Sequence, residues 1–537
     1  QVRSNMRPPV DGAEGQLARM PWILVGVLTL TGLLFRVIVF GESGFGDELS
    51  TLWIVRNNDL AGVVSIVHTD AEITPPLYFL LAKITSVFGP TISSVRLPSL
   101  LAGVGSLPLV YAAGRRLIGS RGALAATLLA TVSPFLVYFS AQARNYAVMI
   151  FLLLLATLLI LEATAEGGRW WHWAGWSLVA ALALFSQYTA GFVILAQVLW
   201  VFWFFPTLRL RMAGFAVLAG LLFMPWITGL RADLDSPTAD IMQALQGSSF
   251  TAKREAVEQL FFHWIEASPP TFFHRPDMML ATAGAAVGLV AAAWRLAGGR
   301  LNLPQGERAR GVWLAVAMVA SVFICTLVLL ALGTDIFGAR NLAPAWVGMP
   351  FLFGSVFVAA GRRAGWVFLI LMIAGFMVST IRLMDPNRST INYSRVADQL
   401  DDSGEKGTIL DASIASPAPL TSLDAYLETD LPVFKMTAIE DRPDYIKQLF
   451  ATYDAQKILD RAFSGAGPVR VVTADDFRAP REITSGGDKG GYEVQVNGQT
   501  AVIPPGWEPV SSHRYPGLEP LTVTVFERSG QTGKSDR

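Results

Sequence analysis

The sequence is short of charge and of cysteine, and both shortages exclude classes of protein. Charged residues make up 16% of the 537 residues, whereas soluble domains usually carry about a quarter, so much of the chain is expected to lie outside water. Basic and acidic residues balance at 42 each, which argues against nucleic acid as a partner because phosphate binding needs a basic surplus. The one cysteine, Cys325, excludes an intramolecular disulfide, and five scattered histidines do not suggest a zinc site.

Long apolar runs are what the sequence has instead. About eleven stretches are long and apolar enough to cross a hydrocarbon core of roughly 30 Å. They lie near 20–40, 95–114, 121–138, 145–164, 170–186, 188–205, 212–229, 278–296, 312–332, 342–360 and 364–383. The first run lacks a small-residue cleavage site, so we expect a signal anchor that stays with the protein.

The character of the chain changes after Asp385, where polar residues, glycine and proline replace the apolar runs. Alternating segments at 467–472 and 521–526 are typical of strands, and 394–402 favours a short helix. The predicted fold class is therefore a polytopic α-helical membrane protein, residues 1–383, followed by an extracytoplasmic α/β domain, residues 384–537.

The placement of arginine predicts the orientation. Positive residues favour the cytoplasmic side of a membrane protein, and alternate inter-span segments are rich in them. These segments contain Arg3, Arg7, Arg19, Arg115, Arg116, Arg121, Arg169, Arg209, Arg211, Arg300, Arg308, Arg310, Arg362 and Arg363. The N-terminus is then inside, and two long loops, 41–94 and 230–277, and the C-terminal domain are outside. Within the first loop, residues 74–84 are too short to span, and we expect an interfacial helix there.

Two adjacent acids, Asp47 and Glu48, follow the first span on the predicted outer side. Acids in the first turn of a helix favour its dipole, and this structural role explains them without any chemistry. The alternative is catalytic: a carboxylate at the membrane–water boundary can take the proton of an attacking hydroxyl. Adjacent acids also suit Mg²⁺ or Mn²⁺, so the sequence leaves metal dependence open.

Arg144 and Arg340 lie in short outer turns, on the side that basic residues usually avoid. One interpretation is that they contact lipid phosphates at the interface. The other is that they hold the phosphate of a donor, because a guanidinium can bind two phosphate oxygens and stabilise the negative charge of a leaving phosphate. Their occurrence on the same face favours the second interpretation.

Other polar residues of the outer loops give weaker indications. His68, Asp70 and Glu72 alternate before the interfacial helix and are able to bind a metal or hydroxyl groups, but we expect a solvated loop. The Asp233-x-Asp235 pair lies on the wrong side for nucleotide sugars and is interpreted as a chance match. Further candidates for lining a substrate cavity are Arg36, His68, Tyr78, Gln142, Tyr146, Gln187 and Tyr188.

Over residues 20–383 the pattern resembles the GT-C superfamily of integral-membrane glycosyltransferases. The resemblance is to the branch with protein O-mannosyltransferases and lipid A aminoarabinose transferases. It rests on ordered motifs: Gly46-Asp47-Glu48, Thr74-Pro75-Pro76-Leu77-Tyr78, Arg96-Leu97-Pro98-Ser99, Gly114-Arg115-Arg116-Leu117 with Gly119, and Ser140 to Tyr146. In two places the chain departs from the pattern. Thr74 stands where relatives carry His or Lys, and Gln142 stands where relatives often carry Glu.

The resemblance implies an inverting transfer in which Asp47 activates the acceptor hydroxyl, with Glu48 as its neighbour or a metal ligand. Arg144 and Arg340 match positions expected to face the donor phosphate. The implied donor is a polyprenyl-phosphate sugar, and the acceptor is a glycolipid, a cell-wall glycan or a protein. The implied location is the bacterial cytoplasmic membrane, with the active site facing the periplasm.

Two other classes of function fit a chain with many spans. A flippase for a lipid-linked sugar usually shows charges at mid-membrane and repeated halves, and we find neither pattern in the sequence. A non-catalytic sensor would use the outer domain to bind a ligand, and its acids would only cap helices. The choice of sugar and acceptor, and the oligomeric state, stay open.

Overall fold

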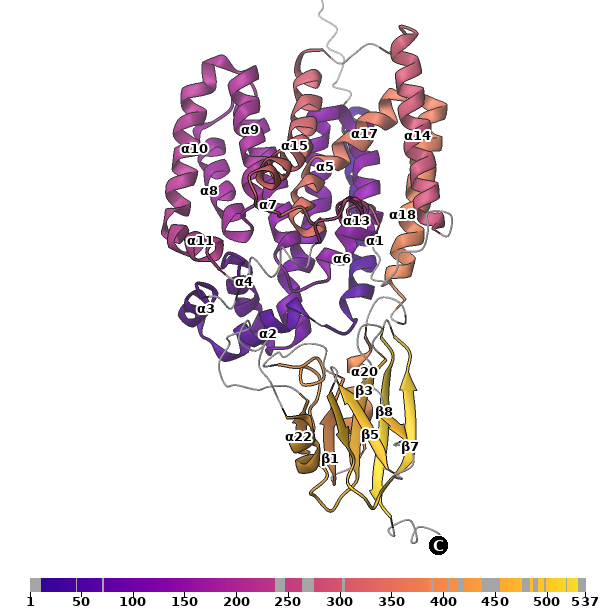
Figure 1. Cartoon of the computed structure of the whole chain (residues 1–537). Coiled ribbons are helices and arrows are strands. Elements are labelled where there is room, and N and C mark those ends of the chain that lie inside the picture. The colour runs from indigo at the N-terminus through magenta and orange to yellow at the C-terminus, as the bar shows by residue number, and fades with distance from the viewer. Residues whose placement is uncertain are drawn as a thin grey trace, which may run out of the picture.

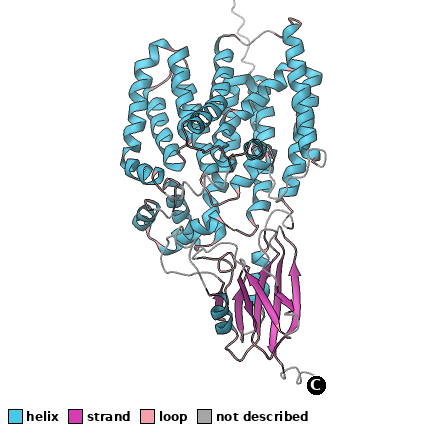
Figure 2. Cartoon of the chain, in the orientation of Figure 1, coloured by secondary structure: helices cyan, strands magenta, loops and turns pink. Residues whose placement is uncertain are grey.

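The computed structural model has a bundle of helices at one end and a β-sheet domain at the other (Figure 1). Coloured by secondary structure, the two parts separate cleanly, and every strand among the described residues lies in the C-terminal domain (Figure 2). The structure describes residues 11–44, 46–69, 72–236, 247–262, 275–301, 305–385, 387, 391–403, 406–413, 420–436, 454–475, 483–485, 491–496, 499–517 and 519–529.

The helical part contains long apolar helices and several short ones between them. The long ones are α1 Asp11–Phe40, α5 Ile92–Val132, α7 Tyr146–Thr164, α8 Trp170–Ser186, α9 Ala190–Phe204, α10 Arg209–Phe223, α14 Pro276–Ala297, α15 Gly306–Ala331, α17 Met349–Ala359 and α18 Arg362–Leu383. The short ones are α2 Asp47–Asn57, α3 Leu60–Val67, α4 Leu77–Thr85, α6 Pro134–Ser140, α11 Ile227–Leu234, α13 Phe250–Gln259 and α16 Ala339–Leu342, with 3-10 turns η1 Ser86–Phe88, η2 Pro206–Leu208, η3 Met224–Trp226 and η5 Ala343–Val347.

Helices occupy all of the eleven predicted apolar ranges, so the chain is a multi-pass membrane protein of mostly helical fold. Among the described residues, seven helices are long and apolar enough to cross a membrane, or eight if the bent pair of α16–η5 and α17 is one span. The count falls below eleven because α5 joins two predicted spans across Gly119, whose φ of 81° interrupts the helix, and because α8 and α9 have 17 and 15 residues. The exact number of crossings stays a prediction.

Arg3 and Arg7 lie outside the described residues, and the other arginines predicted to be cytoplasmic lie at the end of the bundle away from α2. Arg115 stacks over Trp22, at the beginning of the first span. Arg116 donates to Glu162, near the end of α7. The short helices α2, α3, α4 and α11 instead gather at the other end, on the side of the C-terminal domain (Figure 1). Which end of the bundle faces the cytoplasm stays a prediction.

The predicted interfacial helix exists as α4, which has nine residues and is too short to span. Pro76 is its N-cap, so the two prolines come just before the helix and need no backbone hydrogen-bond donor there. Tyr78, Phe79 and Ala82 bury one face of α4 against the bundle. This buried face keeps α4 beside the beginning of α5.

The C-terminal domain is built on a mixed sheet of five strands in the order β2-β1-β3-β8-β7. Its strands are β1 Thr408–Asp411, β2 Val433–Lys435, β3 Val469–Ala474, β7 Trp507–Tyr515 and β8 Leu521–Arg528. A second sheet joins β4 Ile483–Ser485, β5 Tyr492–Val496 and β6 Gln499–Val502. Within the described part of the domain, the helices α20 Tyr393–Asp401 and α22 Ala455–Ala462 accompany the sheets.

The two alternating segments noted in the sequence pair with each other in this sheet. β3 and β8 are antiparallel, with Val471 opposite Thr524, and every residue of β3 is buried. The short helix predicted near 394–402 is α20. Both predictions are confirmed, and the amphipathic periodicity of α20 agrees with its buried face of Tyr393, Val396, Ala397 and Leu400.

The C-terminal domain contacts the bundle immediately after the first span. The amide of Gly44 donates to the hydroxyl of Tyr426, and the hydroxyls of Ser43 and Ser394 are hydrogen-bonded at 2.9 Å. Leu420, Ala425 and Tyr426 pack against the core of the helical part. The segment between α1 and α2 therefore makes hydrogen bonds to the C-terminal domain as well as to the helical bundle.

Candidate active site

Asp47 is the first residue of α2, at the end of the bundle that faces the C-terminal domain. The turn before it needs Gly46, whose φ is 58°, a region that residues with a Cβ disfavour. This turn directs the Asp47 carboxylate toward two arginines that come from distant parts of the chain. Oδ2 of Asp47 accepts a hydrogen bond from Arg340 and lies 4.0 Å from Nε of Arg144.

Arg144 is held by a second acid, Glu72. Its two terminal nitrogens donate to the Glu72 carboxylate at 2.9 and 3.2 Å, and Nη2 also reaches the hydroxyl of Thr74 at 3.4 Å. The side chains of Arg144 and Glu72 are both buried, as expected for an arginine and a carboxylate that form a bidentate ion pair. Nε of Arg144 is buried without a hydrogen-bond partner in the described structure, and it faces Asp47.

Arg340 differs from Arg144 in being half-exposed, with 49% of its side chain accessible. It lies on the single turn α16, which follows a loop fixed by an ion pair between Lys253 of α13 and Asp335. Lys253 Nζ is 2.6 Å from both Asp335 oxygens, and the amide of Phe337 also donates to Asp335. The loop is thus fixed to α13 five residues before Arg340, while the guanidinium itself stays accessible.

The two arginines set the charge state of Asp47. Partial burial by itself would raise the pKa of the Asp47 carboxyl, but the nearby Arg340 and Arg144 guanidinium groups outweigh that effect and lower it. Burial likewise would lower the pKa of Arg144, and the Glu72 and Asp47 carboxylates raise it well above its usual value. The site therefore holds an ionised carboxylate between two permanent cations.

Glu48, the acid beside Asp47, points the other way. Its carboxylate forms a buried bidentate ion pair with Arg96, at 2.7 and 2.6 Å. It also accepts a hydrogen bond from the backbone amide of Ala143 at 2.7 Å. Arg96 also donates to the carbonyl oxygens of Phe40 and Glu42. Glu48 thus fixes α2 to α5 and to the Arg144 turn, and it is a positioning residue in this geometry.

The acids do not fit a metal site. The Glu48 oxygens are occupied by Arg96 and Ala143, and Asp47 lies between two cations that would repel Mg²⁺ or Mn²⁺. Within the residues that the structure describes, no group of three His, Cys, Asp or Glu side chains converges. Asp70 lies outside the described residues.

Tyr78, Gln142 and Tyr146 surround the same site. Tyr78 is buried, and its hydroxyl donates to the Val95 carbonyl at 2.8 Å and accepts from Ser99 at 3.0 Å. Gln142 is half-buried in the turn before Arg144, where its carbonyl accepts the Arg144 amide. The Tyr146 ring packs on Phe139, and its hydroxyl is within electrostatic range of both site arginines. Tyr78 therefore holds α4 to α5, whereas Tyr146 is close to the charged groups.

Gln187 also belongs to this region. Its Oε1 accepts from Asn145, the neighbour of Arg144, and its Nε2 lies 3.5 Å from Asn341, the neighbour of Arg340. The side chain thus connects the two turns that carry the arginines. Arg36 is more remote from the charged cluster: it is buried in α1, where it donates to Ser140 and to the carbonyl of Gly32.

His68 and Tyr188 form a different cluster. His68 hydrogen-bonds Thr228 at 3.1 Å and stacks edge-on against Trp226, and Trp226 donates to the Tyr188 hydroxyl at 2.9 Å. Tyr188 in turn donates to the buried Asp233. These contacts fix α3 and α11 to the turn between α8 and α9, and neither residue contacts Asp47, Arg144 or Arg340 in the described structure.

Four residues that shape the site were not assigned this role from the sequence. Glu72 was expected in a solvated loop, and this expectation was wrong, because Arg144 takes it into the interior. Arg96 was noted only as part of a motif, although a basic residue one turn into an apolar helix signals a buried partner. Lys253 and Asp335 lie in unremarkable segments, and no feature of the sequence indicates their pairing.

The comparisons with known proteins agree with the motifs. Residues 73–228, which include Arg144 but neither Asp47 nor Arg340, match the model of the dolichyl-phosphate-mannose-protein mannosyltransferase family. The predicted resemblance to the GT-C superfamily is thereby confirmed. No curated protein matches the chain by sequence.

Several solved structures were also matched, all at low identity and with TM-scores below 0.5. ArnT from Cupriavidus metallidurans bound to undecaprenyl phosphate is 13% identical, with a TM-score of 0.46 over 87% of this chain and 94% of that one. Its apo state gives 0.41 at 13% identity over 86% and 94%. The oligosaccharyltransferase AglB from Archaeoglobus fulgidus, in complex with an inhibitory peptide and a dolichol-phosphate, gives 0.44 at 12% identity over 86% and 70%.

Proposed function

We propose that the chain transfers a sugar from a polyprenyl-phosphate donor to an acceptor hydroxyl, with inversion at the anomeric carbon. The observation that supports this most is the position of the Asp47 carboxylate between Arg144 and Arg340. A base and two phosphate-binding groups are what such a transfer requires, because the leaving group is a phosphate that needs cations and no general acid. The match to a family that uses a dolichyl-phosphate sugar supports the donor class.

The paired state of Asp47 suggests how the donor prepares the base. A carboxylate bound to two guanidinium groups is a weak base, because its negative charge is already stabilised. A donor phosphate would compete for the half-exposed Arg340 and for the unpaired Nε of Arg144. As Arg340 turns to the phosphate, the pKa of Asp47 rises toward its ordinary value, so the base becomes effective only when the donor is present.

In the proposed step, the acceptor oxygen attacks the anomeric carbon while Asp47 takes the proton of that hydroxyl. The bond between the anomeric carbon and the phosphate oxygen breaks, and the polyprenyl phosphate leaves with the electron pair. Arg144 and Arg340 stabilise the charge that develops on the leaving oxygen. Glu72 and Glu48 contribute by positioning, since they hold Arg144 and the α2 helix through ion pairs.

The location of the reaction follows from charge asymmetry. We propose that the protein lies in a bacterial cytoplasmic membrane, with the Asp47 end of the bundle and the C-terminal domain facing the periplasm. The arginine-rich end would then be cytoplasmic, as the positive-inside rule expects. The acceptor is a glycolipid, a cell-wall glycan or a protein that the C-terminal domain can approach.

The experiment is transfer of radiolabelled sugar from a panel of polyprenyl-phosphate sugars by the purified full-length protein. Wild type is compared with Asp47→Asn and, as a matched control, with Asp235→Asn, an exposed aspartate at the end of α11. We expect one donor to support turnover, with Asp47→Asn losing at least 100-fold, the order of a general base, and Asp235→Asn unchanged.

Two outcomes would contradict the proposal. Equal turnover by Asp47→Asn and wild type would remove Asp47 as the base. Uptake of labelled lipid-linked sugar into vesicles, without transfer to any acceptor, would instead support a flippase.

A further inference from the structure

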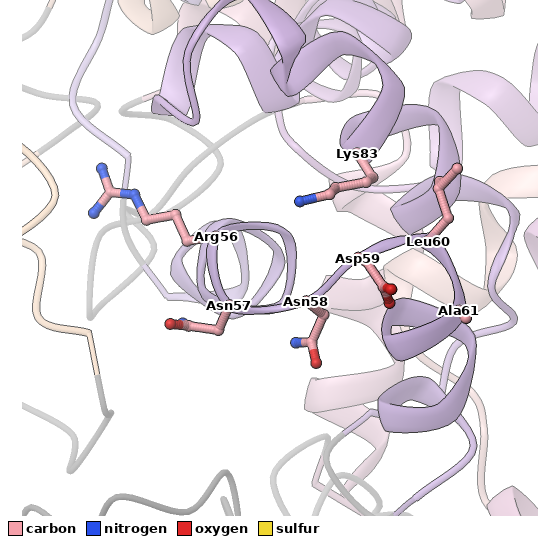
Figure 3. A pocket seen from close by; sticks show the side chains of 7 residues that line it. All are labelled: Arg56, Asn57, Asn58, Asp59, Leu60, Ala61 and Lys83. Carbon is pink, nitrogen blue, oxygen red and sulfur yellow. The ribbon is translucent and has the colours of Figure 1, made fainter.

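The helix that begins with Asp47 has contacts that fix both of its ends. At the start of α2, Glu48 forms the buried ion pair with Arg96 of α5. At the end of α2, Lys83 of α4 donates to a backbone carbonyl of the last turn at 2.9 Å. Arg56 donates at 2.9 Å to a carbonyl of the turn that precedes α5. Figure 3 shows Lys83 and Arg56 on opposite sides of the end of α2, beside a hollow of about 700 Å³. The position of the candidate base is therefore set by contacts to α4 and α5.

Arg340 lies in a segment that is too short to be stable by itself. Its helix α16 has four residues, and the 3-10 turn η5 that follows has five. Helices of this length are not stable in isolation, because their few hydrogen bonds do not offset the cost of the first turn. The Arg340 side chain is itself half-exposed. Contacts from other parts of the chain must therefore hold the backbone that carries this guanidinium.

α13 supplies such contacts on both sides of Arg340. Before Arg340, Nζ of Lys253 lies 2.6 Å from both carboxylate oxygens of Asp335. After Arg340, Nε1 of the buried Trp346 donates at 2.9 Å to the carbonyl of Leu260, the C-cap of α13. The two contact points on α13 are seven residues apart, which is about two turns of helix. One helix from a distant part of the chain therefore fixes the Arg340 segment at two places.

The Lys253–Asp335 pair is built as a structural contact. Its side chains are only 13% and 17% exposed. Nζ of Lys253 also donates to the Phe337 carbonyl at 3.3 Å, and the Phe337 amide donates back to the Asp335 carboxylate at 3.0 Å. The two carboxylate oxygens and this carbonyl account for all three N–H donors of an ammonium group. Lys253 thus has no donor left for a substrate, and its contribution to the site is to hold the chain before Arg340.

We propose that Lys253 is a positioning residue for Arg340, and that α13 controls the donor-phosphate site through the Lys253–Asp335 pair. The pair keeps residues 335–346 in place, so that the Arg340 guanidinium can turn from Asp47 to the phosphate while its backbone stays fixed. The catalytic consequence rests on the proposed function. The hold of α13 on the segment does not, because it is a property of the folded protein.

The test compares full-length wild type with the double variant Lys253→Met/Asp335→Asn. Removing both charges leaves no unpaired ion in the interior, so we expect the fold to be kept. The matched control is Arg254→Gln/Glu258→Gln, which neutralises a more exposed ion pair on the same helix. Amide hydrogen exchange of residues 335–346 should become about tenfold faster in the first variant, as expected for loss of a charge-assisted contact. It should be unchanged in the control.

Kinetics with the identified donor measure the catalytic consequence. Displacement of Arg340 should lower kcat by about 10- to 100-fold in the double variant and should raise KM for the donor. The control variant should keep both constants. A lower kcat with an unchanged donor KM would overturn the proposal, because it would indicate only a loss of folded protein.

The exchange measurement separates this inference from the proposed function. Equal exchange of residues 335–346 in wild type and in the double variant would overturn the hold by Lys253, whether or not any donor is turned over. Faster exchange with wild-type kcat and donor KM would overturn the positioning role. If no donor supports turnover, the proposed function fails, and the exchange rates alone decide whether α13 holds the segment.

Discussion

The guanidinium of Arg340 donates to the carboxylate of Asp47, although 293 positions separate the two residues in the sequence. Arg340 is half-exposed, so this pair is accessible to a ligand, unlike the buried pairs Arg96–Glu48 and Arg144–Glu72. Arg340 and Arg144 therefore have different expected roles. Arg144, held by Glu72, defines the position of a bound phosphate, and Arg340 is expected to move from Asp47 to the phosphate when the donor binds.

Replacing Arg340 tests the phosphate role. We expect Arg340→Gln to lower kcat by about 100-fold, the order found for loss of one group that stabilises developing charge, and to raise KM for the donor. Arg340→Lys keeps the charge but loses the planar fork, so it should recover only part of the rate. Steady-state kinetics with the identified donor measure both. A glutamine variant with wild-type donor kinetics would contradict the role.

The same substitution should change the dependence of the reaction on pH. The arginines lower the pKa of Asp47, so in the donor-free protein the carboxylate stays ionised to lower pH than a free aspartate does. Without Arg340 the pKa rises, because desolvation is then opposed by Arg144 alone. The acidic limb of kcat/KM, which reports the free enzyme, should therefore move to higher pH in Arg340→Gln. An acidic limb at the same pH in both proteins would show that Asp47 does not produce it.

The buried pair between Glu72 and Arg144 should contribute to stability. Glu72→Gln removes the bidentate counterion of the buried Arg144 and leaves only Asp47 at 4.0 Å, and breaking a buried pair usually costs about 3–5 kcal/mol. Thermal unfolding in detergent should show a clear loss. The matched control is Glu162→Gln, which breaks the exposed pair with Arg116 at the other end of the bundle and should cost at most about 1 kcal/mol. Similar losses for the two variants would argue against a stabilising role for the buried pair.

The hydroxyl of Tyr426 should stabilise the segment before α2, because it links this segment to the C-terminal domain through the Gly44 amide. Tyr426→Phe removes the acceptor of the Gly44 amide and leaves the ring in place, at a cost of roughly 1–3 kcal/mol for an unpaired buried donor. Hydrogen exchange of residues 41–50 should become faster and kcat should fall severalfold, without loss of the fold. Tyr515→Phe, within the domain, is the control, and equal exchange in the two variants would leave Tyr426 without this role.

Asp411 predicts how the stability of the C-terminal domain depends on pH. Burial raises the pKa of Asp411 to about 6, although Ser413 and Thr421 donate to its carboxylate. Since the folded pKa lies above the unfolded value, the folded state binds the proton more tightly. The domain should therefore lose stability as pH rises from about 4 to about 6. Hydrogen exchange of β1 should show this trend in wild type and a flatter one in Asp411→Asn, and parallel curves would exclude Asp411 as the cause.

Much of the fold is predictable because the solvent imposes it. Apolar runs about as long as a bilayer is thick have to be helices in lipid, so the positions of α1, α7 and α18 follow from composition. The break at Gly119 also agrees with the sequence, because the predicted spans 95–114 and 121–138 lie on either side of it.

The site was predictable where chemistry left a mark on the sequence. Asp47 stood out as one of two adjacent acids at the membrane boundary, and Arg144 and Arg340 as cations on the side that basic residues usually avoid. The structure brings the three together. Glu72 and Glu48 were misplaced or left undecided because a carboxylate in a loop looks the same whether it faces water or an arginine. Their partners lie 72 and 48 positions away, a distance that local patterns do not encode.

The way the charged groups are distributed along the chain has a consequence for biogenesis. Glu48, Glu72, Arg96 and Arg144 all belong to the first part of the chain to emerge from the ribosome, so their two buried pairs can form while later helices are still being inserted. Arg340 arrives much later, and only then does Asp47 gain its second cation. The nascent protein would thus enter the membrane with its scaffold in place and its reactive centre incomplete until the last helices arrive.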